Sequence, residues 1–171
     1  MAGKIQLLSD EVIGKIAAGE VVERPAAAIK ELVENSLDAG ASAVTVEIRD
    51  GGISYFRVTD NGSGIRSEDI RMAFERHATS KIRRTDDLFS IQTLGFRGEA
   101  LASIAAVAHV TCTTRTKADQ SGIKVQNNGG TIESIEEAAC PEGTTFVVRD
   151  LFFNTPVRLK FLKKPVTDCL L

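Results

Sequence analysis

The chain has 171 residues, of which 43% are hydrophobic and 26% charged, and its formal net charge is −2. This composition is ordinary for a globular protein and excludes a disordered or fibrous chain, and the length is most economically one domain around a single core. The near-neutral charge gives no overall attraction to nucleic acid, and the three widely spaced cysteines do not suggest a disulfide framework or a zinc site. No apolar run approaches the ~20 residues of a membrane span, so we expect a cytoplasmic protein with no membrane association.

The first predicted elements are two helices. Ser9 or Asp10 can cap a helix through residues 11–22, in which apolar residues recur at helical spacing. Pro25 suits the first turn of the second helix, which we expect to end at Gly40.

This second helix separates polar from apolar residues. At about 100° per residue, Glu31, Asn35 and Asp38 fall within about 60° of one another. The opposite side carries the apolar residues Ile29, Leu32, Val33 and Leu37. The apolar side can pack on a core while the polar side binds a ligand or performs chemistry, although a solvated helix face has the same pattern.

Beyond Gly40 the pattern changes to a period of two. Residues 44–48 and 54–59 predict the two strands of a hairpin, with Gly51-Gly52 at its turn. The next predicted helix begins at Ser67 and includes Phe74.

A long segment of poor periodicity, residues 79–96, then predicts a loop of the kind that forms a lid or is disordered. The remainder of the chain predicts one alanine-rich helix over residues 98–107, followed by strands. The strands are expected at residues 109–114, 122–125, 131–135 and 144–148, with a hairpin turn at 127–130.

The segment DNGSG directly follows a predicted strand. Gly62 and Gly64 let main chain approach a flat ring closely, and the Asp60 carboxylate can accept a hydrogen bond from an exocyclic amine such as that of adenine. Guanine presents a carbonyl at that place, which would leave the carboxylate unpaired and so disfavour guanine. Because Asp-Asn-Gly is also a favoured turn sequence, a plain turn remains the alternative.

A second glycine-rich segment lies at the start of the alanine-rich helix. Free backbone amides at a helix start form an anion site, and glycines let them close around phosphate oxygens. The segment comprises Gly95, Phe96, Arg97 and Gly98. Lys81 and Arg97 can add positive charge for a polyphosphate, but a ligand-free helix start with exposed basic residues fits as well.

The polar helix face fits this nucleotide hypothesis. The amide oxygen of Asn35 can ligate Mg²⁺, and Glu31, one turn earlier, can polarise a water as a general base. Asp38 suits either an orienting role or the end of the helix. Gly143-Thr144-Thr145 opens a late predicted strand, and a threonine hydroxyl there can share the hydrogen-bond network of the adenine, although threonine is also a common strand residue.

Two basic clusters are either solvated faces or phosphate contacts. They comprise Arg76, Lys81, Arg83 and Arg84, and Arg158, Lys160, Lys163 and Lys164. The sequence has neither a GxxxxGK[ST] phosphate loop nor a GxGxxG dinucleotide fingerprint, so any phosphate site has another design.

Taken together, five segments resemble the N-terminal ATPase of MutL-type DNA mismatch-repair proteins. They are IAAGEVVERPAAAIKELVENSLDAGA, DNGSGI, RHATSKI, LGFRGEALASI and DLFFNTPVRLKFL. MutL belongs to the GHKL group, with gyrase B subunits, heat-shock chaperone ATPases and histidine kinases. The resemblance extends from about Ile5 to Lys164, and GFRGEAL is specific to MutL-like proteins, whereas DNGxGI alone indicates the wider group.

The resemblance implies an α+β fold of the Bergerat type, a two-layer sandwich with helices on one face of a mixed, mainly antiparallel sheet. ATP would lie between helices and a mobile lid. By resemblance, Glu31 would be the general base, Asn35 the Mg²⁺ ligand and Asp60 the residue that binds the adenine amine. The remaining roles would fall to Gly62 and Gly64 in the base pocket, to Thr145 in the adenine network, and to Thr79, Ser80, Lys81 and the Gly95–Gly98 loop in the lid and triphosphate site.

As for function, the resemblance implies a module that binds ATP and hydrolyses it slowly. Nucleotide-driven lid closure would control dimerisation and the engagement of DNA, of a mismatch-recognition protein and of other repair proteins, with self-association through the lid and the N-terminal region. The location would be cytoplasmic and nucleoid-associated in a bacterium, or nuclear in a eukaryote.

Family members continue into the rest of the ATPase domain, a transducer domain that supplies a lysine to the γ-phosphate, and a C-terminal dimerisation domain. We therefore expect residues 1–171 to form a C-terminally truncated GHKL-type ATP-binding domain. The alternative is a fragment that binds nucleotide or DNA without turnover. A GHKL protein phosphotransferase is disfavoured, because the chain lacks an accompanying phosphoacceptor-histidine domain and contains GFRGEAL.

Overall fold

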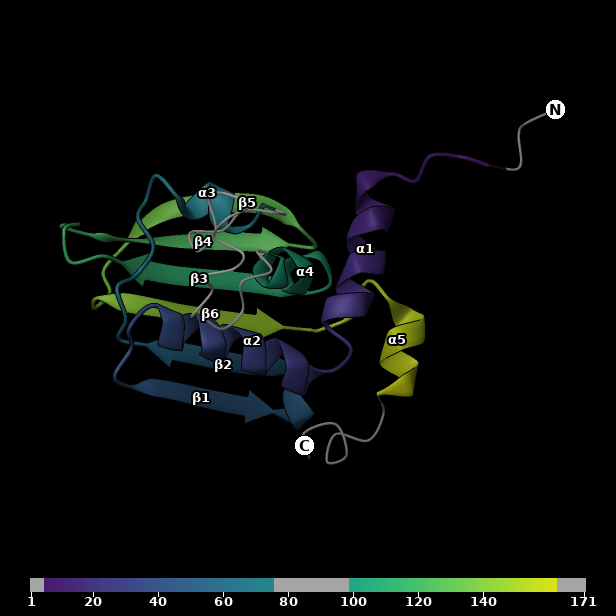
Figure 1. Cartoon of the computed structure of the whole chain (residues 1–171), viewed down its shortest axis with the longest axis horizontal. Helices are drawn as coiled ribbons and strands as arrows, with labels where there is room; N and C mark the ends of the chain where they lie inside the picture. The colour runs from purple at the N-terminus through teal and green to yellow at the C-terminus, as the bar shows by residue number, and fades with distance from the viewer. Residues whose placement is uncertain (1–4, 76–98, 163–171) are drawn as a thin grey trace, which may run out of the picture.

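The computed structural model describes residues 5–75 and 99–162 (Figure 1). The helices are α1 (Asp10–Val21), α2 (Pro25–Asp38), α3 (Ile70–Ala73), α4 (Ala100–Ala106) and α5 (Pro156–Phe161). The strands are β1 (Val44–Arg49), β2 (Tyr55–Asp60), β3 (His109–Arg115), β4 (Gly122–Asn128), β5 (Thr131–Ala138) and β6 (Gly143–Arg149), and a 3₁₀ turn, η1 (Asp50–Gly52), joins β1 to β2.

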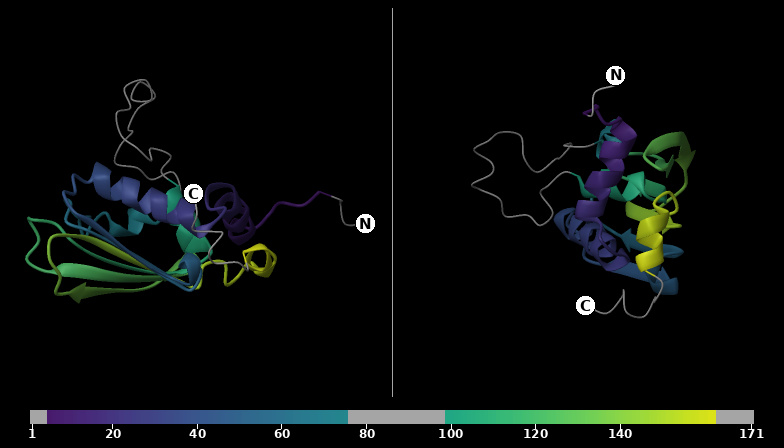
Figure 2. Two further views of the ribbon diagram at one scale, coloured as in Figure 1. Left: turned by 90° about the horizontal axis from the view of Figure 1, so that it is seen from below. Right: turned by 90° about the vertical axis from the view of Figure 1, so that its right-hand side faces the viewer.

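The strands form one six-stranded sheet in the order β1-β2-β6-β3-β4-β5, and every pairing among the described residues is antiparallel. Helix α2 lies over one face of this sheet, α4 contacts α2 and α1, and no helix of residues 5–75 and 99–162 covers the other face (Figure 2). The predicted α+β sandwich with its helices on one face is confirmed. No helix in the described part of the chain is both long and apolar enough to cross a bilayer.

The core lies between α2, α4 and the covered face of the sheet. Alternate residues of each strand point to this side, because successive side chains of a strand face opposite ways. They include Phe56 and Val58 of β2, Val110 and Cys112 of β3, and Phe146 and Val148 of β6, against Ala28 and Leu32 of α2 and Ile104 of α4. Leu37, predicted to pack with Leu32, is 51% exposed at the end of α2.

Helix α1 begins where the sequence predicts, with Ser9 as its N-cap. The apolar residues that recur at helical spacing are not all buried. Val12 and Ile16 are 40% and 51% exposed, whereas Ala18 and Val22 are fully buried. A helical period identifies a face, but the tertiary packing decides which residues are covered.

Two predicted hairpin turns are confirmed. At the β4–β5 turn, Gly129 and Gly130 have φ of 59° and 94°, the left-handed backbone for which glycine is favoured in a tight hairpin. Several predicted boundaries were wrong by a few residues: α3 has four residues, α4 begins at Ala100, and β4 and β5 each extend three residues further. Element ends are set by pairing partners that local patterns do not contain.

The last helix, α5, is absent from our sequence-based elements, although Pro156 occupies its first turn. The Arg158 guanidinium donates hydrogen bonds to the carbonyl oxygens of Gly19, at 2.8 Å, and Glu23, at 3.4 Å. It also lies 5.8 Å from the ring centroid of Phe152. Arg158, which belongs to the second of the two basic clusters seen in the sequence, therefore joins α5 to the C-terminal end of α1.

Candidate functional site

The candidate site is built where the polar side of α2 meets the end of β2. Glu31 and Asn35 are partly exposed and lie one turn apart on α2. Between them in sequence, Leu32 is buried against the sheet, and Ser36 is buried one residue beyond Asn35. The same helix therefore places a carboxylate and an amide at its surface while Ser36 faces the sheet.

Ser36 connects this helix to Asp60. Its hydroxyl lies 2.7 Å from Asp60 Oδ2 and 3.1 Å from the Leu32 carbonyl oxygen, so its one proton is shared between two acceptors. The contact joins residues 24 positions apart in the chain. Because Ser36 is buried, the contact fixes the height of α2 above the end of β2.

The carboxylate of Asp60 is held from three directions. Besides the Ser36 contact, Asp60 Oδ1 accepts hydrogen bonds from the backbone N–H groups of Gly62, at 2.9 Å, and Thr144, at 3.1 Å. A carboxylate can accept about four hydrogen bonds. Asp60 is only partly buried, so its oxygens retain capacity for about one further donor, such as an amino group of a ligand.

The glycines after Asp60 have a packing role that the sequence did not reveal. A side chain at Gly62 would stand 2.8 Å from the Ala39 carbonyl oxygen, and one at Gly64 would collide with the Arg115 carbonyl. Gly64 also has a φ of 73°. Their lack of a side chain lets this turn pass closely between the end of α2 and the end of β3, whatever they contribute toward a ligand.

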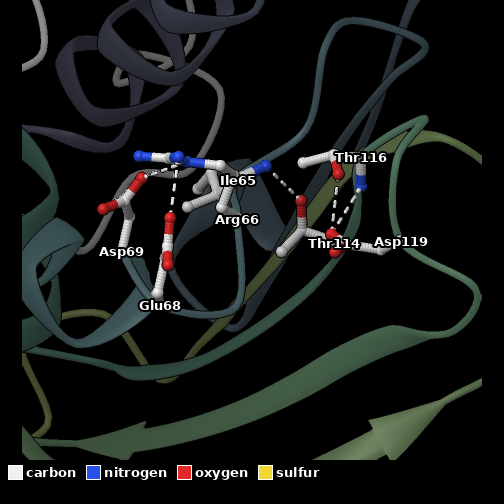
Figure 3. A network of polar contacts seen from close by, with 7 residues as sticks. All are labelled: Ile65, Arg66, Glu68, Asp69, Thr114, Thr116 and Asp119. Atoms are coloured by element: carbon white, nitrogen blue, oxygen red, sulfur yellow. Dashed lines mark hydrogen bonds and ion pairs between the residues drawn. The ribbon is translucent and has the colours of Figure 1, made fainter.

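Hydrogen bonds at Asn61 and Ile65 attach the two ends of this turn to other parts of the chain. Asn61 Oδ1 accepts the backbone N–H groups of Ser42 and Ala43 at 2.9 and 3.0 Å. On the other side, the Ile65 N–H donates to Thr114 Oγ1 at 2.9 Å (Figure 3). Both ends of the segment are therefore fixed by partners far away in sequence.

Two buried threonines extend the network across the sheet. Thr114 Oγ1 lies 2.9 Å from Thr144 Oγ1 and donates to the Gly143 carbonyl oxygen at 3.0 Å. The register pairs Thr144 with both Asp60 and Thr114, so all three side chains point to the covered face. The sequence did not reveal Ser36 or Thr114 and did not distinguish Thr144 from Thr145; only the strand register could have identified the two threonines of this network.

Thr145, the threonine that the resemblance implied for the adenine network, lies on the uncovered face. It pairs with Thr59, and their hydroxyl oxygens are 3.3 Å apart. Successive residues of a strand face opposite ways, so the structure does not bring Thr145 to Asp60. The hydroxyl beside Asp60 is that of Thr144.

Several predicted site residues lie outside the described part of the chain. They are Thr79, Ser80, Lys81, Gly95, Phe96, Arg97 and Gly98. The chain re-enters the structure at Glu99, directly before α4, which contacts α2. Among residues 5–75 and 99–162, no group of three or more His, Cys, Asp or Glu side chains could hold a metal ion.

Residues 23–146 match the family model described as the histidine kinase-, DNA gyrase B- and HSP90-like ATPase. Among curated proteins, the chain is 56% identical over 167 residues to the DNA mismatch repair protein MutL of Caldanaerobacter subterraneus subsp. tengcongensis, covering 98% of this chain and 28% of that protein. It is 54% identical over 168 residues to MutL of Parabacteroides distasonis, covering 98% and 27%. The chain thus spans little more than a quarter of the length of these relatives.

Two solved structures are similar throughout most of the chain. The N-terminal domain of a DNA repair protein is 34% identical with a TM-score of 0.75, and the match covers 92% of this chain and 46% of that one. The Aquifex aeolicus MutL ATPase domain complexed with ADP is 36% identical with a TM-score of 0.66, covering 86% and 51%.

Proposed function

Because the chain belongs to the histidine kinase-, DNA gyrase B- and HSP90-like ATPase family and is of the MutL type, we propose that it binds ATP with Mg²⁺ and hydrolyses it slowly in DNA mismatch repair. In this proposal, nucleotide binding is the signal that controls dimerisation and the engagement of DNA and other repair proteins. A ligand can act in this way when it binds one conformation more tightly than another.

The observation that carries the proposal is the fixed carboxylate of Asp60. Ser36, Gly62 and Thr144 hold it by hydrogen bonds of 2.7 to 3.1 Å, and it keeps room for about one more donor. The exocyclic amine of adenine is such a donor. A guanine carbonyl facing the same carboxylate would leave it unpaired, which favours adenine over guanine nucleotides.

Residues of α2 fit the phosphate end of the same ligand. Ser36 holds α2 to Asp60, and the turns before it present Glu31 and Asn35, which are both partly exposed. Their side-chain oxygens are of the kind that Mg²⁺ prefers. In the proposal Asn35 ligates the ion, Glu31 accepts a proton from the attacking water, and Asp38 orients its neighbours. Bound Mg²⁺ would neutralise charge on the phosphates.

The first test is isothermal titration of this chain with a non-hydrolysable ATP analogue and Mg²⁺. We expect saturable binding, and Asp60→Asn to weaken it about tenfold or more while affecting inorganic triphosphate less. Asp150→Asn is the matched control, because Asp150 is exposed at the opposite end of the sheet. Equal affinities of the parent chain and Asp60→Asn would reject the adenine role.

A second candidate function is a unit that binds nucleotide or DNA without turnover. It is worth testing because the chain spans about a quarter of the length of its MutL relatives. Single-turnover measurement of phosphate release separates the two functions. Slow release that disappears in Glu31→Ala, with analogue affinity retained, supports the ATPase; release unchanged in Glu31→Ala would place the general base elsewhere.

A further inference from the structure

The two edge strands of the sheet, β1 and β5, differ in how well they are protected against pairing with another strand. β5 carries three glutamates, Glu133, Glu136 and Glu137, and its pairing with β4 shifts register at Gln126/Asn127. Charges and bulges of this kind keep a further strand away from an edge. β1 has one glutamate and one arginine, and all six of its residues pair with β2 in one continuous register. Of the two edges, β1 therefore offers the regular and electrically neutral one.

The outer side of β1 presents backbone hydrogen-bonding groups. The Ala43 carbonyl oxygen accepts the Asn61 N–H at 3.4 Å, so the residue directly before β1 points this group at the strand that β2 leads into. In an antiparallel pair the backbone groups alternate in direction along a strand. The N–H and C=O groups of Val44, Val46 and Ile48 therefore point away from β2, where no strand of residues 5–75 and 99–162 pairs with them.

Apolar side chains lie along the same edge. Val44, Val46 and Ile48 pair with Asp60, Val58 and Phe56, so they share the covered face of the sheet. Helix α2, however, packs over β2 and η1 rather than over β1, which is the outermost strand on this side (Figure 1). Val46 is consequently 39% exposed and Ile48 43% exposed.

The neighbouring side of α2 is apolar as well. Ile29, Val33 and Leu37 recur at every fourth residue and form one ridge along the helix. Ile29 reaches the end of β1, because its Cδ1 lies 3.6 Å from the position that a side chain at Gly52 would occupy. Together with the apolar residues of β1, this ridge makes a surface that we call the β1 flank: Ile29, Val33, Leu37, Val44, Val46 and Ile48.

From this arrangement we propose that β1 pairs antiparallel with β1 of a second copy of this chain, which joins two sheets into one across a two-fold axis at Val46. The axis sets Val46 opposite Val46 of the second copy and Val44 opposite Ile48 of the second copy, so that the outward backbone groups bond to one another. Placing the axis at Glu47 would set two carboxylates directly opposite, and placing it at Ile48 would bring the η1 turn into the ladder. A contact of this kind closes after two copies.

Charge and apolar surface both suit this register. Glu47 faces Thr45 of the second copy, and its carboxylate is already bridged to two guanidinium groups at 2.7 and 3.1 Å. The same pairing at β5 would bring together three carboxylates from each copy. The contact encloses the β1 flank between two α2 helices, which removes apolar surface from water. At about 100° per residue the ridge lies away from Glu31 and Asn35, so the inference does not depend on nucleotide binding.

The first test is sedimentation velocity of this chain without nucleotide, at concentrations from about 1 to 200 µM. We expect an equilibrium between monomer and dimer. Val46→Lys should weaken dimerisation at least about tenfold, because it places two like charges next to the axis. Ser134→Lys is the matched control, since it adds the same charge on the other edge strand, β5, and it should leave the equilibrium unchanged. Circular dichroism checks the folding of each variant.

Cross-linking then tests the register. Val46→Cys places two thiols at the axis, where the Cα atoms of a hydrogen-bonded antiparallel pair are about 5.5 Å apart, within the range of a disulfide. Under mild oxidation we expect more disulfide-linked dimer than in the parent chain or in Glu133→Cys, on β5. The proposal is overturned if the parent chain stays monomeric, if Val46→Lys dimerises like the parent, or if Ser134→Lys loses as much affinity. A dimer that forms only with an ATP analogue would also overturn it, because that contact would belong to the nucleotide response.

Discussion

The two ends of the β2–β6 strand pair use polar side chains in opposite ways. At one end, on the covered face, Asp60 and Thr144 are held by neighbours from β3, α2 and the following turn. At the other end, on the uncovered face, Tyr55 carries two exposed arginines with one bridging carboxylate nearby. The first region is preorganised by burial and fixed partners; the second owes its character to charge. Substitutions in the first region should therefore lower the free energy of unfolding. Substitutions in the second region should mainly change the surface charge.

The largest expected effect on stability is at Gly64, on the covered side. Gly64→Ala should lower the free energy of unfolding by about 3 kcal/mol or more, because the new side chain collides with the Arg115 carbonyl at a φ of 73°. Gly40→Ala is the control: Gly40 has the same φ, but a side chain there meets nothing within 4 Å. It should cost only about 1 kcal/mol. Urea unfolding followed by circular dichroism measures both, and similar losses would contradict the role of the close approach.

The two neighbouring threonines of β6 provide a direct comparison of the two faces. Thr144→Val removes a buried hydroxyl that lies 2.9 Å from Thr114 Oγ1 and should cost about 1–2 kcal/mol. Thr145→Val removes only the 3.3 Å contact with Thr59 on the uncovered face and should cost less than about 0.5 kcal/mol. Thr144→Val should also weaken binding of the ATP analogue, and Thr145→Val should not. If Thr145→Val weakened binding of the ATP analogue and Thr144→Val did not, Thr145 would be the threonine of the adenine network, as the resemblance implied.

Removing the bridging charge should show how little stability depends on the ion pairs of the uncovered face. Glu47→Gln loses two exposed ion pairs, with Arg49 and Arg57, so the free energy of unfolding should change by less than about 1 kcal/mol. The dissociation constant of the proposed dimer should change by less than about threefold, because Glu47 lies opposite Thr45 of the second copy and not opposite a charge. Glu133→Gln, on edge strand β5, is the control. A loss of more than about 2 kcal/mol would contradict the contrast between the two regions.

The smallest expected effect concerns the chemical reactivity of one thiol, that of Cys112, and neither stability nor binding. Burial raises the pKa of the Cys112 thiol, and the nearby Asp60 carboxylate adds to the effect. Less thiolate forms at a given pH, so alkylation of Cys112 should be at least about tenfold slower than that of the partly exposed Cys140. Mass spectrometry of peptides from briefly alkylated protein measures both rates. Urea should abolish the difference, and equal rates in the folded chain would show that the covered face opens readily.

The sequence predicted those features whose causes are local. The side of α2 that carries Glu31 and Asn35 follows from helical spacing, the hairpin turn at Gly129-Gly130 from glycine's access to positive φ, and the position of Asp60 from the strand that precedes it. The family resemblance, carried by motifs contiguous in the chain, was confirmed by the family model and by the MutL relatives.

Other features required the assembled sheet. Thr144 and Thr145 are equivalent by composition, and only the pairing of β6 with β2 and β3 decides which one reaches Asp60. Likewise, the exposed side of α1 could not be identified from its period, because the positions of α4 and α5 determine what is covered.

The amino-acid sequence thus determined the order of the strands and of every described helix except α5, the polar face of α2 and the family, since these depend on spacing and on motifs along the chain. Tertiary structure alone decided which threonine joins Asp60 and how Tyr55 comes to lie between Arg49 and Arg149. The physical reason is that side chains on neighbouring strands meet through backbone register. A shift of one residue would send every side chain of a strand to the other face.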